Sequence, residues 1–223
     1  MLLTFVDLDA FGRERGVLWN ARGGDHMTLT LHWQTTGIEA GRLLLDAIAA
    51  RFGVTWPKGR VLVFDFDVHH GNGTQHAFEE RKDVLFCSMH QHPLTLYPGT
   101  GFAEERGRGA GLGYTINAPM APYSTDADYL ALFEQRLLPA FRAYQPQFVL
   151  ISAGFDAHRD DPLAMINLTQ FGFDRLLAQM KQLALECCGG KLVSALEGGY
   201  NYAALSACVA SHLEILQADE PRL

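Results

Sequence analysis

Val-Leu-Val-Phe-Asp-Phe-Asp-Val-His-His-Gly-Asn-Gly, residues 61–73, joins an apolar run to a polar end. The run from Val61 to Phe64 is β-branched or large and apolar, which is typical of a fully buried strand in a parallel sheet. Asp67 and His69 follow two positions apart, and side chains at that spacing point to the same side of an extended backbone. A carboxylate and an imidazole that converge in this way can bind a zinc-like cation. In this stretch alone, a helix cap or a solvated loop explains the carboxylates equally well.

The composition fits a single globular α/β domain. With 223 residues, 48% of them apolar and 19% charged, the chain can bury a substantial core. The net charge of −7 indicates neither a nucleic-acid partner nor an anionic membrane surface, although it suits a basic peptide or a polyamine. The four cysteines form no C-x-x-C pair and are expected to be reduced thiols. No apolar run approaches the roughly 20 residues of a membrane span, and residues 1–9 lack the basic start of a signal peptide, so we expect a cytoplasmic protein.

Apolar runs and amphipathic segments alternate along the chain. Short runs of β-branched and aromatic residues predict strands, and apolar residues at helical spacing predict the helices between them. This order predicts a parallel, doubly wound sheet flanked by helices. Thr169 is expected to be the N-cap of its helix. The expected strands are 2–8, 27–33 (at a sheet edge), 61–64, 84–89, 113–118, 148–153 and 191–196, and the expected helices are 38–52, 74–81, 126–144, 169–188 and 202–217.

Polar residues gather where the predicted strands end, which is where ligands bind in open α/β sheets. Asp156 can add a third ligand to Asp67 and His69, and this set leaves the open coordination position that a catalytic metal needs. Tyr200 follows two glycines and is placed to donate its hydroxyl to a developing oxyanion. The four groups at strand ends are Asp65 with Asp67 and His69, Ser88 with His90 and His92, Asp156 with His158, and Glu197 to Tyr200.

Each of these candidates has a structural alternative. The three candidate ligands could be caps or loop hydrogen-bond partners, and Asp160 and Asp161 are competing carboxylates that lie past the turn. Tyr200 could instead pack with its hydroxyl on the backbone. The other histidines are interpreted as loop-ordering residues (His90, His92) or as surface or hydrogen-bonded polar groups (His76, His158, His212).

Four motifs occur in one order along the chain: Asp-Phe-Asp-Val-His-His-Gly-Asn-Gly at 65–73, Tyr-Pro-Gly-Thr-Gly at 97–101, Gly-Phe-Asp-Ala-His-Arg-Asp-Asp-Pro at 154–162 and Glu-Gly-Gly-Tyr-Asn at 197–201. Together they resemble the zinc-dependent histone deacetylase and acetylpolyamine amidohydrolase family, in its class II-like, bacterial branch. The resemblance covers roughly residues 58–217 and is highly specific. It implies an arginase-like α/β fold. It also implies hydrolysis of acetyl groups from acetyl-lysine, polyamines or similar small acyl amides.

The resemblance also implies roles for single residues. Tyr200 would polarise the acetyl carbonyl. Asp65 would lie behind the site, orient a catalytic histidine in family members, and help to hold a structural K⁺ together with Ser88 and nearby backbone carbonyls. The ligands of the Zn²⁺ would be Asp67, His69 and Asp156.

The amino-terminal part departs from the family pattern. The family has a Pro-Gly-His-His pair before the central strand that serves as general base, whereas the first 60 residues here contain only His26 and His32, neither paired. General-base catalysis contributes about 10²- to 10⁴-fold, so its loss predicts a weak enzyme. We therefore expect an atypical or truncated segment at residues 1–36 and a deacetylase-like α/β domain at residues 37–223, within one domain overall.

Three hypotheses follow from the sequence. The first is a zinc amidohydrolase that removes acetyl groups. The second is a non-catalytic homologue that binds metal and an acyl ligand without turnover, and the third is a truncated remnant that folds poorly. The sequence leaves the substrate and the oligomeric state open.

Overall fold

The computed structural model describes residues 2–8, 14–20 and 59–218, and within them one sheet of seven strands in the order β2-β1-β7-β6-β3-β4-β5. All neighbouring strands pair in parallel except β1 and β2, which are antiparallel. The strands are β1 (Leu2–Leu8), β2 (Glu14–Asn20), β3 (Val61–Asp65), β4 (Val84–Gln91), β5 (Thr115–Met120), β6 (Phe148–Ala153) and β7 (Leu192–Leu196).

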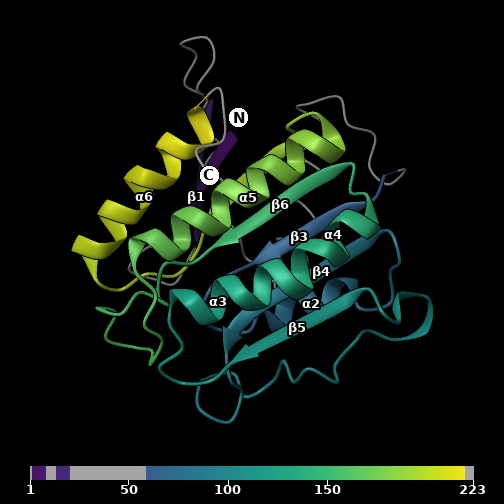
Figure 1. Ribbon diagram of the computed structural model, residues 1–223, viewed down its shortest axis with the longest axis horizontal. Helices are drawn as coiled ribbons and strands as arrows, with labels where there is room; N and C mark the ends of the chain where they lie inside the picture. Colours follow the sequence, from purple (N-terminus) through teal and green to yellow (C-terminus); the bar gives the residue numbers. More distant parts are fainter. Residues whose placement is uncertain (1, 9–13, 21–58, 219–223) are drawn as a thin grey trace.

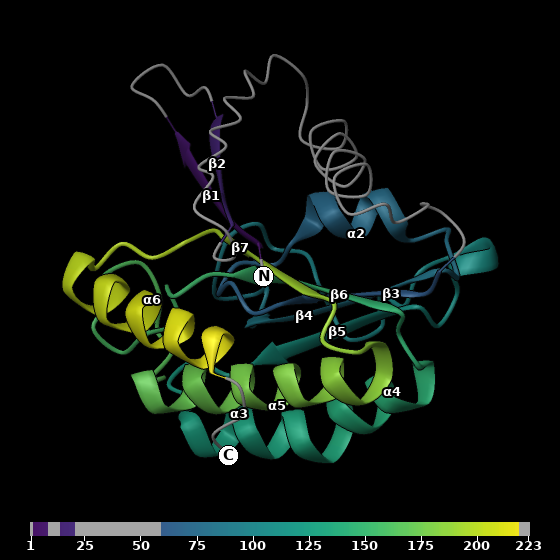
Figure 2. The same cartoon turned by 90° about the horizontal axis from the view of Figure 1, so that it is seen from above.

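Helices lie on both faces of the sheet, as Figures 1 and 2 show. Helix α2 covers one face, and α3, α4, α5 and α6 cover the other. A parallel sheet flanked by helices is thus confirmed. The helices are α2 (Asn72–Phe78), α3 (Asp126–Leu132), α4 (Leu138–Tyr144), α5 (Gln170–Cys188) and α6 (Tyr202–Gln217).

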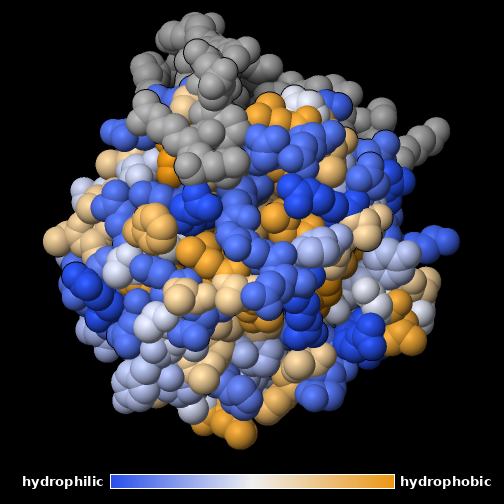
Figure 3. All heavy atoms as spheres, in the orientation of Figure 1, coloured by the Kyte–Doolittle hydropathy of each residue, from blue (hydrophilic) through white to orange (hydrophobic). Residues whose placement is uncertain are grey.

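The core between the sheet and the larger helical layer is rich in phenylalanine. Phe64, the fourth residue of β3, packs against Phe133 and Phe141, with ring centroids 5.4 and 5.6 Å from its own. Phe66 continues the cluster toward Phe155, and all five rings are almost fully buried. Each such ring contributes about 1.5–3 kcal/mol by burial. On the outer side of these helices, hydrophilic and hydrophobic residues are interspersed (Figure 3). The aromatic cluster therefore anchors β3, and with it the motif that follows the strand.

Three elements differ from the sequence prediction. Strand β2 was not expected, because Gly16 and its charged neighbours interrupt the alternation of apolar and polar residues. Its backbone instead forms a strand by pairing with β1. Strand β5 starts later and runs past Pro119, which an edge strand tolerates because it has one free side. The helix expected over 126–144 contains a π-turn at Phe133–Leu137. The π-turn ends two residues before Pro139, whose missing N–H cannot continue the α-helical pattern.

The remaining helix and strand predictions hold to within a few residues, and Phe148–Ala153 and Tyr202–Gln217 match in full. Thr169 occupies the N-cap position of α5, but its hydroxyl donates to Asp126 instead of capping the helix. The expected strand at 27–33, the expected helix at 38–52 and both early histidines lie outside the described residues. In the parts of the chain with described structure, no helix is long and apolar enough to cross a membrane. The four cysteines are free thiols.

Candidate metal centre

The four polar groups predicted at strand ends meet because their strands are neighbours. Strands β7, β6, β3 and β4 are consecutive in the sheet and run parallel. Their carboxyl ends therefore lie along one edge, where open α/β sheets bind ligands. One correction applies: Ser88 and His90 do not follow β4 but lie within it, fully buried, because β4 extends to Gln91.

Asp67, His69 and Asp156 lie together at this edge. Nδ1 of His69 is 3.1 Å from Oδ1 of Asp67 and 3.1 Å from Oδ2 of Asp156. One ligand atom from each residue lies within 4.8 Å of the others. Asp156 is fully buried, Asp67 is 7% exposed, and the His69 side chain is 24% exposed. The convergence predicted from the spacing of two is therefore present, although strand β3 itself ends at Asp65.

Backbone N–H groups hold the two carboxylates in place. The N–H of Val68 donates to Asp156 Oδ1 at 2.8 Å, and the N–H of His69 donates to Asp67 Oδ1 at 2.8 Å. The N–H of Gly198, from the loop after β7, donates to Asp67 Oδ2 at 2.9 Å. Backbone N–H groups from two loops, after β3 and after β7, thus fix the orientation of the two carboxylates.

Two glycines leave the space that these carboxylates occupy. A Cβ added to Gly154 would overlap Asp67 Oδ2. A Cβ added to Gly198 would overlap Asp156 Oδ2 and lie 2.5 Å from Asp67 Oδ2. The motifs Gly-Phe-Asp and Glu-Gly-Gly-Tyr therefore need glycine at these positions because the backbone itself touches the cluster. Sequence reasoning assigned no role to Gly154, and its position two residues before Asp156 is the signal that could have identified it.

The cluster concentrates negative charge in a buried place. Burial raises the pKa of Asp156 to about 6. Burial also raises the pKa of Asp65, and the charges of Glu197 and Asp67 raise it further. The pKa of His69 rises to about 10 because its ring is hydrogen-bonded to Asp156 and Asp67. A site that stabilises positive charge this strongly is suited to a cation.

Tyr200 lies on the loop that follows β7, with 48% of its surface exposed. Its N–H donates to Asp161 Oδ2 at 2.7 Å, and Asp161 Oδ1 accepts the N–H of Leu163 at 3.0 Å. Burial raises the pKa of Tyr200, and the charges of Asp156 and Asp67 raise it further. Asp161, weighed in the sequence as a competing ligand, instead ties the Tyr200 backbone to the loop after β6.

Asp65 and Ser88 lie side by side in the pairing of β3 with β4. Asp65 Oδ1 accepts the N–H of Asp67 at 3.0 Å. Ser88 Oγ lies 2.9 Å from Nδ1 of His90, whose Nε2 lies 2.9 Å from the carbonyl of Gly101. A carbonyl only accepts, so His90 Nε2 is protonated. Burial lowers the pKa of His90 to about 4, so its Nδ1 is a bare acceptor and the Ser88 hydroxyl donates to it.

The other histidines have structural contacts. His90 orders the loop through Gly101, as expected, and His212 is buried with its Nε2 2.9 Å from Ser194 Oγ. His76 is exposed and lies 3.1 Å from Glu79. His158 Nδ1 accepts the N–H of Asp160 at 3.2 Å.

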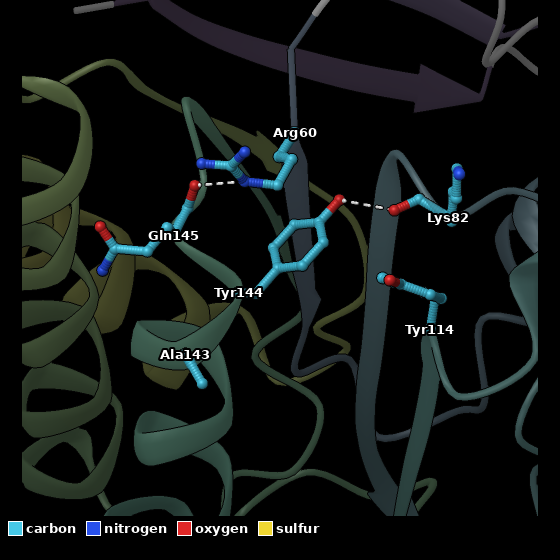
Figure 4. Close-up of a pocket in the computed structure, with 6 residues that line it drawn as sticks. All are labelled: Arg60, Lys82, Tyr114, Ala143, Tyr144 and Gln145. Carbon is cyan, nitrogen blue, oxygen red and sulfur yellow. Dashed lines mark hydrogen bonds between the residues drawn. The ribbon is translucent and has the colours of Figure 1, made fainter.

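A pocket of about 450 Å³ lies at the other end of the strands, among residues just before β3, β4 and β5 and at the end of α4 (Figure 4). Arg60 Nε donates to the carbonyl of Gln145 at 2.8 Å, and the Tyr144 hydroxyl donates to the carbonyl of Lys82 at 3.4 Å. Figure 4 shows the Tyr144 ring between Arg60 and Lys82. The pocket is thus remote from the Asp–His–Asp cluster and plays no part in it.

A parallel α/β sheet with a buried Asp–His–Asp group at its carboxyl edge defines a protein with a candidate catalytic metal centre. The chain belongs to the histone deacetylase family, because the histone deacetylase domain matches residues 46–216. The resemblance seen in the four motifs is therefore confirmed.

Individual proteins show how far this similarity extends. Histone deacetylase 15 of Arabidopsis thaliana is 43% identical over 177 residues, which are 78% of this chain and 31% of that protein. The histone deacetylase-like amidohydrolase of Pseudomonas aeruginosa is 38% identical over 172 residues, 77% of this chain and 44% of that protein. The crystal structure of an acetylpolyamine aminohydrolase from Burkholderia pseudomallei has a TM-score of 0.66 at 37% identity and covers 76% of this chain and 46% of that one. The chain spans less than half the length of these three relatives.

Proposed function

We propose that this chain is a zinc-dependent hydrolase that removes acetyl groups from acetyl-lysine, acetylpolyamines or similar small acyl amides. Asp67, His69 and Asp156 would hold the Zn²⁺. The observation that carries the proposal is the group of three converging ligand atoms in a chain of the histone deacetylase family. Free thiols are consistent with a cytoplasmic setting, which is also part of the proposal.

The donor set fits zinc. Zinc takes one imidazole nitrogen and carboxylate oxygens at about 2.0–2.2 Å, so two ligands of a tetrahedral ion lie about 3.4 Å apart. The separations of 3.1 Å between His69 Nδ1 and the two carboxylates are close to that value. Three protein ligands leave a fourth position open, as catalytic zinc sites require. When bound, the ion activates water and polarises a carbonyl oxygen.

The chain's own groups would then orient the substrate and stabilise charge. Tyr200 would donate its hydroxyl to the acetyl oxygen as negative charge develops there, which is the role of an oxyanion-hole donor. Its raised pKa keeps the hydroxyl protonated at neutral pH. Asp65 would lie behind the metal ligands and help to orient Asp67, because Asp65 Oδ1 accepts the N–H of Asp67.

We also propose a structural K⁺ beside Asp65 and Ser88. The Ser88 hydroxyl proton points to His90, so its oxygen lone pairs are free for a cation. Burial raises the pKa of the Asp65 carboxylate. The charged groups that raise it further, Glu197, Asp67 and Asp156, are all acidic. Gly71 leaves room for the Asp65 carboxylate, because a Cβ at Gly71 would overlap Asp65 Oδ2.

The second candidate is a non-catalytic homologue that binds metal and an acyl ligand. It is favoured by one observation, the absence of a Pro-Gly-His-His pair from the sequence. Zinc content and turnover of an acetyl-lysine reporter, with and without a chelator, separate the candidates. Zinc with chelator-sensitive turnover supports the hydrolase, and zinc without turnover supports the binding homologue. A folded protein without zinc would refute both.

A further inference from the structure

A chain of buried polar side chains connects the metal motif to the loop at 97–105, and it involves neither the three candidate ligands nor Tyr200. His70, which follows His69, is 4% exposed, and Gln75 is 8% exposed. His70 Nε2 lies 2.9 Å from Gln75 Oε1, and Gln75 Nε2 donates to Glu105 Oε2 at 2.7 Å. Groups buried to this degree must satisfy their hydrogen bonds, so the direction of each bond can be worked out.

The carboxylate of Glu105 sets the direction of the whole chain. Its Oε1 accepts the N–H groups of Gly101 and Phe102 at 2.8 and 2.9 Å. Partial burial acts to raise the pKa of Glu105, but the hydrogen bonds from Gln75 and from these two N–H groups outweigh it and hold the pKa below its usual value. Glu105 is therefore ionised and only accepts hydrogen bonds.

Gln75 can adopt only one orientation beside that carboxylate. Its NH₂ group must face Glu105, so its carbonyl oxygen faces inward. Asn117 confirms the direction, because its Nδ2 donates both to Gln75 Oε1 at 2.7 Å and to the Glu105 carbonyl at 3.1 Å. Turning Asn117 over would bring its oxygen against two acceptors.

His70 then has one compatible proton position. Since Gln75 Oε1 only accepts, Nε2 of His70 must carry a proton. The other ring nitrogen, Nδ1, lies 2.8 Å from the Thr100 hydroxyl oxygen, and in the neutral ring it accepts the hydroxyl proton of Thr100. The Gly101 backbone packs on this ring, because a Cβ there would lie 2.6 Å from His70 Cγ and 2.5 Å from His90 Nε2.

We infer that Glu105 is a positioning residue which, through Gln75, fixes His70 as the tautomer protonated on Nε2 and holds the 97–102 loop against the metal motif. The proton on His70 Nε2 follows from the hydrogen-bond geometry of Glu105, Gln75 and Asn117. Its consequence for turnover rests on the proposed deacetylase function.

Glu105→Gln tests the inference because it reverses the polarity of the chain. The new amide must give its oxygen to the two backbone N–H groups and turn its NH₂ toward Gln75. Gln75 must then turn over, and Asn117 with it because Asn117 Nδ2 would otherwise face the Gln75 NH₂ group. Gln75 then donates to His70 Nε2, which moves the His70 proton to Nδ1. Glu104→Gln is the matched control. Glu104 directly precedes Glu105 and is exposed, so this substitution removes the same charge outside the buried chain.

The measurement is ¹⁵N NMR of histidine-labelled, zinc-loaded protein, with His70→Asn to assign the His70 signals. We expect a protonated Nε2 in the wild type and in Glu104→Gln, and a protonated Nδ1 in Glu105→Gln. A wild type protonated on Nδ1, or a folded Glu105→Gln protein with unchanged His70 signals, would overturn the inference. Thr100→Ala provides a second test at an exposed site. The inference requires Nε2 to stay protonated there, and a proton that moves to Nδ1 would show that Thr100 sets the tautomer.

Turnover gives a separate measurement. We expect Glu105→Gln to lower kcat/KM about tenfold at unchanged zinc content, in line with the loss of a charge-assisted hydrogen-bond network, while Glu104→Gln keeps the wild-type value. Equal kcat/KM in both variants would refute the link to turnover. If the wild type has no turnover at all, the proposed function fails, and the NMR result still decides the tautomer.

Discussion

Gly198→Ala is the substitution whose effect on the metal centre can be worked out most directly from the structure. The added methyl group would overlap Asp156 Oδ2 and lie 2.5 Å from Asp67 Oδ2. Neither carboxylate can retreat freely, because Asp156 is bonded to the N–H of Val68 and Asp67 to the N–H of His69. Gly198 itself is bonded to Asp67 through its own N–H. The clash therefore falls on the two candidate ligands and on the loop that carries Tyr200.

The expected cost is that of overpacking a tightly packed site, about 1–3 kcal/mol. If this cost appears in metal binding, zinc affinity falls about 5- to 150-fold. The assay is competition for zinc with a chromophoric chelator, with circular dichroism to show that the variant is folded. Gly73→Ala is the matched control within the metal motif, because a Cβ there meets nothing within 4 Å. A folded Gly198→Ala protein that binds zinc as tightly as the wild type would refute the ligand assignment.

Three further outcomes are expected. Burial lowers the pKa of His212 to about 4, below its value of about 6.5 in the unfolded chain. Between these pH values the unfolded chain therefore binds one more proton than the folded protein. Up to about 3 kcal/mol of folding stability is lost as the pH falls from 6.5 to 4. Denaturant unfolding at several pH values should show this loss in the wild type and a smaller one in His212→Leu. Asp161→Asn replaces an acceptor of the Tyr200 or Leu163 N–H by a donor and should lower kcat about tenfold with zinc content unchanged; equal kcat would show that this contact is dispensable. Zinc at 100 times its Kd should raise the unfolding free energy by about 2.7 kcal/mol, and a melting temperature that does not respond to zinc or chelator would contradict a native metal site.

Much of the fold could be predicted because the strands of a buried parallel sheet are continuous apolar runs. Phe148–Ala153 shows this best, since its ends match the prediction. Strand β2 could not be found this way, because its pairing with β1 is a tertiary property that its sequence does not display. Pro119 likewise looked like the end of a strand, and only its place at the sheet edge makes it compatible with one.

The candidate site was predictable in its residue types but not in its supports. Asp67 and His69 were found from their spacing, and Asp156 from its place after another strand. The order β7-β6-β3-β4, which brings these ends together, was not predicted, and it is what the structure adds. The contact between Gly198 and the carboxylates, and the chain from Glu105 to His70, depend on long-range approaches between loops that no local pattern reports.

Anomalous X-ray diffraction at the zinc edge, from crystals of the zinc-loaded protein, tests the central claim most directly. The predicted result is one strong peak about 2.0–2.2 Å from His69 Nδ1 and from one carboxylate oxygen each of Asp67 and Asp156. A zinc peak bound elsewhere, or no peak at this edge of the sheet at saturating zinc, would contradict it.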